Sequence, residues 1–212
     1  IENKSMKATC FRYSTGVEAV KIENGKGYFI ILPFQGQQIW RTGFLGHELT
    51  MKTRFDEPAP TLDFMETYGG FLLHCGVCSM GASDNSHPQH GETPNAVYKK
   101  AYIECDEGYI AVGGSLDYDV SFTRNYTFSP ECRLYEDDTV LKLYVQLENR
   151  RKDPMEYMYL CHINFCSIIG ARLMYSADYD SEHVKVHKII GNNAPQDQME
   201  ELLAYMEQLE TL

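Results

Sequence analysis

The sequence predicts a mainly β protein, a large antiparallel β-sandwich with an amphipathic helix at the C-terminal end. Three observations predict it: runs of alternating apolar and polar residues, short turn sequences between these runs, and a last segment with helical spacing. Strands that are joined by short turns pair in antiparallel fashion. No alternation of strands and helices precedes residue 190, which argues against a doubly wound parallel sheet.

The clearest strand signal runs from Thr139 to Asn149, where leucine and valine alternate with polar residues, as in a strand with one buried face. A second alternating run spans Val97 to Cys105, and the residues expected to share its apolar side are Val97, Ala101, Ile103 and Cys105. Two apolar, aromatic-rich runs, Gly27 to Pro33 and Met155 to Phe165, are typical of central strands.

The last segment, from Pro195 to Leu212, has apolar residues at helical spacing: Met199, Leu202, Leu203, Met206 and Leu209. This predicts an amphipathic helix. Two interpretations of it stay open, a terminal helix that packs on the sandwich and a sequence that stops early. The length of 212 residues fits one sizeable core, so we expect a single domain over residues 1–212.

Charge and cysteine usage limit the partners and the compartment. The chain has 30 acidic against 19 basic residues and a formal net charge of −11, which disfavours nucleic acid and anionic membrane surfaces. No run reaches the roughly 20 apolar residues that a membrane helix needs, and the first residues lack a signal-peptide pattern. An odd number of cysteines, 7, fits a reducing compartment. We therefore expect a cytoplasmic protein.

The long irregular segment from Arg54 to Asn95 is the first place to look for a site, because such segments in compact domains are often functional. It holds a group of residues able to bind metals or transfer protons: His74, Cys75, Cys78, His87, His90 and Glu92. Three interpretations compete: a structural zinc site, a cupin-like metal centre that would use His162 as a further ligand, and metal-free acid–base chemistry.

A second candidate lies at the end of an apolar run. His162 and Asn164 are two residues apart, so on a strand they point to the same face. Two polar side chains on one face of an apolar strand are costly in a core, which favours a concave ligand surface.

Four motifs in order carry a resemblance to a known family: residues 33–40 (PFQGQQIW), 70–76 (GFLLHCG), 87–94 (HPQHGETP) and 162–165 (HINF). Together they resemble a bacterial branch of the aldose 1-epimerase, or galactose mutarotase-like, proteins. The resemblance implies a large twisted β-sandwich with an open carbohydrate cleft. It also implies interconversion of aldose anomers, in which an acid protonates the ring oxygen and a base deprotonates the anomeric hydroxyl.

The resemblance also implies roles for single residues. His162 looks like the family's general acid, and His90 looks like the histidine that binds and polarises the sugar. Asn164 would orient the substrate or the imidazole of His162, and Glu92 would accept a hydrogen bond from the sugar. The remaining expected sugar contacts are His74, His87, Gln38 and Arg41. No metal and no other cofactor is expected.

The family's general base is a glutamate in late strands that this sequence does not reach, so we expect a C-terminally shortened form or a different proton acceptor. A carbohydrate-binding protein without catalysis and a metal-dependent cupin-like enzyme are the alternatives. An incomplete sandwich would leave a free sheet edge, and such edges tend to pair, which makes a homodimer an expectation.

Overall fold

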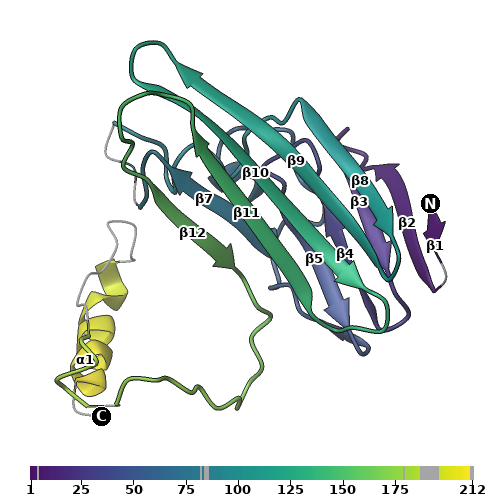
Figure 1. Ribbon diagram of the computed structural model, residues 1–212. Coiled ribbons are helices and arrows are strands. Elements are labelled where there is room, and N and C mark those ends of the chain that lie inside the picture. Colours follow the sequence, from purple (N-terminus) through teal and green to yellow (C-terminus); the bar gives the residue numbers. More distant parts are fainter. Residues whose placement is uncertain (4, 82, 84–85, 179, 187–195, 211–212) are drawn as a thin grey trace. The chain divides into compact units, whose positions relative to one another are not determined.

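A computed structural model describes residues 1–3, 5–81, 83, 86–178, 180–186 and 196–210 (Figure 1). The chain divides into two compact units, Ile1–Ser167 and Ile168–Leu212. The first unit holds all of the named strands, which confirms the mainly β class. The single domain expected over residues 1–212 stays a prediction.

The larger sheet has eight strands that pair in antiparallel fashion, in the order β1-β2-β3-β4-β5-β7-β12, with β6 pairing to β5. Its strands are β1 (Glu2–Asn3), β2 (Met6–Arg12), β3 (Glu18–Glu23), β4 (Gly27–Ile31), β5 (Ile39–Phe44), β6 (His47–Glu48), β7 (Leu72–Val77) and β12 (Met158–Ile163). A short 3-10 helix, η1 (Met65–Thr67), lies in the long segment before β7.

The smaller sheet has four strands in the order β11-β10-β9-β8. They are β8 (Lys100–Asp106), β9 (Tyr109–Val120), β10 (Arg124–Tyr135) and β11 (Leu141–Asn149), all antiparallel. Along β10 every second residue from Tyr126 to Leu134 is buried, because one face of the strand packs inward and the other faces outward.

The two sheets lie face to face and share one apolar core (Figure 1). Ile22 and Phe29 of the larger sheet belong to the same buried cluster as Val112 and Leu134 of the smaller sheet, and each is fully buried. A second cluster joins Val77 to residues that include Phe128 of β10. The antiparallel sandwich that the alternating sequence predicts is therefore confirmed.

The start of β8 differs from the expectation. Val97 was expected on the buried side, but it is 63% exposed, whereas Tyr98 is 2% exposed. The strand begins only at Lys100. The preceding residues belong to a crossing loop, in which Val97 forms an isolated bridge with Gln35 and the Tyr98 amide donates to the carbonyl of Phe34. The alternation of the strand does not extend into that loop.

The run from Met155 to Phe165 forms a shorter strand than expected, at a different place in the sheet. Within the described residues, β12 is the last strand in the order of the larger sheet and pairs with β7. Met158 and Leu160 are 52% and 42% exposed, since no further strand among these residues covers them. An apolar run alone does not distinguish a central strand from an edge strand of this kind.

The second unit contains η2 (Gln196–Gln198) and the helix α1 (Met199–Leu209). Four apolar side chains of α1 are partly buried, and they follow one another at helical spacing: Met199, Leu202, Met206 and Leu209. The amphipathic C-terminal helix is thus confirmed, but Leu203, which was expected on its apolar side, is 42% exposed. None of the helices in the described part of the chain has the length and apolar character of a membrane span.

We predict that the core between the sheets sets the stability of the first unit. Leu134→Ala removes a fully buried side chain from the shared cluster, and we expect it to lower the free energy of unfolding by about 3 kcal/mol. Urea denaturation followed by the fluorescence of the buried Trp40, the sole tryptophan, measures this. Leu62→Ala is the matched control, because Leu62 is 74% exposed and its loss is expected to change stability by less than about 0.5 kcal/mol. Equal effects of the two substitutions would contradict the assigned core.

Candidate functional site

Two histidines that lie far apart in the sequence meet on one face of the larger sheet. The ring centroids of His90 and His162 are 5.3 Å apart, and the ring planes are inclined at 62°. His162 lies on β12 opposite Leu73 of β7, and Leu73 packs with Phe64 rather than with the core between the sheets. The pair therefore lies on the face of β7 and β12 that points away from the smaller sheet.

A tight loop brings His90 to this place. The His90 amide donates to the carbonyl of Gly81 at 3.0 Å, and the Gly76 amide donates to the carbonyl of His90 at 2.9 Å. The backbone of His90 is left-handed, with φ at 61°, and Gly91 follows with φ at 81°. A Cβ atom on Gly91 would lie 2.4 Å from the carbonyl oxygen of Gly76, so the loop needs glycine at this position.

Two aromatic side chains, Phe64 and Tyr68, form an aromatic wall beside the histidine pair. Phe64 meets the ring of His90 edge-on at a centroid distance of 4.8 Å, and Tyr68 meets His162 in the same manner at 6.0 Å. The ring centroids of Phe64 and Tyr68 are 5.0 Å apart. We did not predict either residue as a site residue. The available signal was the aromatic content of the irregular segment from Arg54 to Asn95, which indicated order there.

Asn164 holds this wall in place. Its side-chain amide donates to the carbonyl of Gly70 at 2.9 Å, and its Oδ1 accepts a hydrogen bond from the Tyr68 hydroxyl at 3.0 Å. The side chain is buried, and its amide is shared between the backbone and Tyr68. Asn164 was expected to orient a substrate or the imidazole of His162. In the structure it orients Tyr68, which in turn contacts that imidazole.

The surroundings favour a neutral imidazole at His90. Burial lowers the pKa of His90, and the neighbouring His162 lowers it further. The Nδ1 atoms of both rings are buried without a hydrogen-bond partner. A buried N–H without a partner is costly, so the tautomer that carries its proton on Nε2 is favoured in each ring. In that tautomer Nε2 is the donor of each ring, and accepting a proton at Nε2 requires the other tautomer, with the proton on Nδ1.

Glu92, for which we expected a sugar contact, has one carboxylate oxygen bound to the protein. Its Oε1 atom accepts hydrogen bonds from the backbone amides of Val77 at 3.0 Å and Cys78 at 2.9 Å, and from the Tyr126 hydroxyl at 2.5 Å. Burial and this carboxylate raise the pKa of Tyr126, and they raise the pKa of the Cys78 thiol to about 12. Sequence reasoning did not indicate Tyr126, because nothing in its strand distinguishes it from a core residue.

His87 lines a separate hollow beside this loop. The hollow has a volume of about 500 Å³, and Cys78, Glu92 and Arg124 also line it. The Nδ1 atom of His87 is 2.9 Å from the carbonyl oxygen of Pro88. The structure thus places His87 in the same loop as His90 but against a different part of the surface.

His74 lies inside the sandwich. It is 1% exposed, its Nδ1 is 2.8 Å from the Tyr159 hydroxyl, and its ring packs edge-on against Phe128 of the smaller sheet. Burial lowers the pKa of His74 to about 4. Its neighbour Leu73 faces the histidine pair, and successive strand residues point to opposite faces. His74 therefore does not share the face of the histidine pair.

Gln38 and Arg41 donate hydrogen bonds within the protein, mainly to the long segment from Arg54 to Asn95. Gln38 donates from Nε2 to the carbonyl of Pro94 at 2.7 Å and to Oδ1 of Asn95 at 2.5 Å. The guanidinium of Arg41 donates to three carbonyls, those of Trp40, Gly69 and Phe55. These contacts fix the segment that carries Phe64 and Tyr68, so both residues shape the site from a distance.

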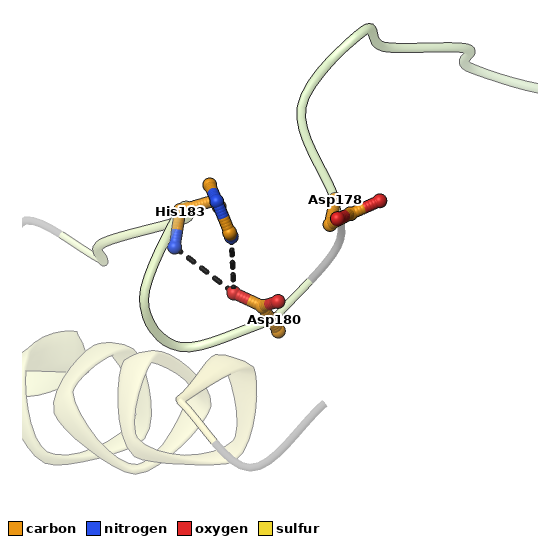
Figure 2. Close-up of side chains that lie close together, drawn as sticks. All are labelled: Asp178, Asp180 and His183. Atoms are coloured by element: carbon orange, nitrogen blue, oxygen red, sulfur yellow. Dashed lines mark hydrogen bonds and ion pairs between the residues drawn. The ribbon is translucent and has the colours of Figure 1, made fainter.

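The second unit contains one group of possible metal ligands, formed by Asp178, Asp180 and His183 (Figure 2). All three side chains are exposed. The carboxylate of Asp180 accepts hydrogen bonds from the amides of Glu182 and His183 and lies 2.7 Å from Nδ1 of His183. These contacts are those of a turn closed by an aspartate. Elsewhere in the described residues, no three His, Cys, Asp or Glu side chains bring their ligand atoms within 4.8 Å of one another.

Solved structures share this architecture. A protein from Klebsiella pneumoniae described as a "putative aldose 1-epimerase" superposes with a TM-score of 0.68 at 16% identity, over 76% of this chain and 47% of that one. A galactose mutarotase-like protein from Clostridium acetobutylicum superposes with a TM-score of 0.54 at 15% identity, over 69% of this chain and 50% of that one. The fold is therefore the galactose mutarotase-like β-sandwich, and the chain spans about half the length of these two proteins.

The family is also defined. The chain belongs to the family described as "Domain of unknown function (DUF4432)", whose model matches residues 14–176. This range includes the histidine pair, the aromatic wall and the loop around Glu92. No curated protein matches the sequence significantly.

We predict that burial of His74 makes the stability depend on pH. The folded state holds His74 neutral with a pKa of about 4, whereas the unfolded chain binds a proton below about pH 6.5. Stability is therefore lost as the pH falls from about 6.5 towards 4. Between pH 7 and pH 5 the wild type is expected to lose about 2 kcal/mol more than His74→Gln, measured by urea denaturation at both pH values.

His47→Gln, at an exposed residue of β6, is the control. We expect this variant to show the same pH dependence of stability as the wild type. Equal losses of stability in the wild type and His74→Gln would show that the fold accepts a charge at position 74.

Proposed function

We propose that this chain binds an aldose at the pair of His90 and His162 and interconverts its anomers, as an aldose 1-epimerase does. The observation that carries the proposal is the pair itself, two imidazoles with centroids 5.3 Å apart beside an aromatic wall. The fold shared with mutarotase-like proteins supports it. A ring that combines hydroxyls with apolar C–H faces suits polar nitrogens next to aromatic side chains.

The chemistry needs one acid and one base at two oxygens of the same carbon. His162, acting in its imidazolium form, donates its Nε2 proton to the ring oxygen as the bond between that oxygen and the anomeric carbon breaks, and the ring is left as a neutral imidazole. A base takes the proton of the anomeric hydroxyl, whose oxygen becomes the carbonyl oxygen of the open aldehyde. Rotation of the aldehyde and the reverse transfers close the ring on the other face, and the proton count is unchanged.

His90 is the base in this proposal. Its lowered pKa keeps the imidazole neutral at pH 7. It accepts the proton at Nε2 in the tautomer that carries its own proton on Nδ1. Glu92, the carboxylate nearest to it in the sequence, has Oε1 bound by Val77, Cys78 and Tyr126. An imidazolium at His162 and a neutral imidazole at His90 therefore suffice, and the reverse transfers return each ring to its starting state once the sugar ring has closed.

One observation favours a second candidate, a carbohydrate-binding protein without catalysis. The carboxylate of the 87–92 motif is committed to the protein, and a low pKa makes His90 a weaker base than a carboxylate-assisted histidine. The protein would then bind the sugar without converting its anomers, and the aromatic wall would supply the binding contacts.

A mutarotation assay tests the proposal. The rate at which freshly dissolved aldoses relax, followed by polarimetry or by NMR exchange, is expected to exceed the buffer rate with the wild type. His162→Ala and His90→Ala are each expected to lower the rate about 100-fold or more, because each removes a proton-transfer group. His47→Ala, on the exposed strand β6, is the matched control and is expected to keep the wild-type rate.

Sugar binding measured on the same proteins distinguishes the two candidates. If every aldose relaxes at the buffer rate while a sugar still perturbs the NMR signals of His90 and His162, the protein binds without catalysis. If neither rate nor signals change with any sugar, both candidates fail.

A further inference from the structure

We infer that Glu92 is a positioning residue: together with Tyr126 it fixes the loop that carries His90 at its distance from His162. The catalytic meaning of this inference rests on the function proposed above, whereas the structural statement stands on its own. The motif suggested a sugar contact for Glu92. The hydrogen bonds of its carboxylate assign it a different task.

Strand β7 is the common support of the two histidines. His162 is placed by the pairing of β12 with β7, in which it lies opposite Leu73. His90 is placed by the loop that returns to the other end of β7, where the amides of Glu92 and Thr93 both donate to the carbonyl of Gly76 at 3.0 Å. The separation of the rings is therefore set by how firmly this loop is attached to β7.

The carboxylate of Glu92 makes that attachment. The ladder between β7 and β12 ends with the pair of Val77 and Met158, and there the amides of Val77 and Cys78 donate to Oε1 of Glu92. The hydroxyl of Tyr126, a fully buried residue of β10, adds a third donor to the same oxygen. Hydrogen bonds to a charged acceptor are among the stronger ones in proteins, and here they join the loop to both sheets.

The need for such an anchor is visible in the backbone of His90. A non-glycine residue at φ 61° is in a sparsely populated conformation, and it persists only where its surroundings impose it. The hydrogen bonds on either side of His90, to Gly81 and from Gly76, provide part of that restraint. Glu92 provides the rest, because it lies two residues further along the same loop.

Three variants test the inference: Glu92→Ala, Glu92→Gln and Tyr126→Phe. Alanine removes all three hydrogen bonds, glutamine keeps an acceptor oxygen without the charge, and phenylalanine removes one donor. The first readout is the pKa of His90, obtained by NMR titration of its imidazole. Burial and His162 lower this pKa in the wild type, so release of the loop is expected to raise it towards the ordinary value of about 6.5.

The second readout is the mutarotation rate. Misplacing a catalytic group by about 1 Å costs on the order of 100-fold, so we expect a loss of that size in kcat for Glu92→Ala. Smaller losses are expected for Glu92→Gln and Tyr126→Phe, in step with the change in the His90 pKa. KM is expected to change less than kcat, because the aromatic wall is anchored elsewhere.

Glu131→Gln is the matched control. Glu131 also accepts a hydrogen bond from a tyrosine, Tyr102, at 2.6 Å, but it does so on the outward face of the smaller sheet. We expect this variant to leave both the His90 pKa and the rate unchanged. A general loss of stability would affect the control and the test variants alike.

The outcomes separate the inference from the proposed function. If the wild type shows no mutarotation but the His90 pKa rises in the variants, the proposed function fails and the positioning role stands. If a folded Glu92→Ala leaves the His90 pKa unchanged, the positioning role is overturned. If Glu92→Ala does not fold, Glu92→Gln and Tyr126→Phe decide. A folded Glu92→Gln that loses as much rate as Glu92→Ala, with the His90 pKa unchanged, would assign the carboxylate a direct chemical role and overturn the inference.

Discussion

Contact between the apolar faces of the two sheets is the interaction on which the first unit depends. Neither sheet can bury its inner side chains alone, and each supplies the other with a cover. The larger sheet has two occupied faces around β7, because Leu72 packs into the shared core while Leu73 packs under the aromatic wall. The candidate site thus lies on one face of β7, and the opposite face of the same strand packs in the core. The core therefore holds the strand on which the histidines are placed.

Much of the fold was predictable because alternation reports directly on a strand with one buried face. Val97 was misplaced because alternation in sequence continues past the point where the backbone stops being a strand. The edge position of β12 was also missed, since its order in the sheet depends on which strand it pairs with. That choice is made by contacts between residues distant in the sequence, which a local pattern does not contain.

The candidate site was predictable in its chemistry and less so in its geometry. His90 and His162 were expected to act together, and the structure brings them together across the β7–β12 pair. The structure places two other predicted site residues away from this pair: His74 points into the core, and the carboxylate of Glu92 binds backbone amides. Residue type indicates what a side chain is able to do, but a shift of one position along a strand reverses the face it occupies.

The left-handed backbone at His90 also bears on how the family can vary. Glycine tolerates this conformation at the least cost, and asparagine, aspartate and histidine are the other residues enriched in it. A drifting sequence would relieve strain at this position by replacing the histidine with glycine. If relatives keep a histidine at position 90, before the glycine, selection has acted on the imidazole ring itself. An asparagine at that position would instead mark relatives in which the loop kept its shape after the proton-transfer group was lost.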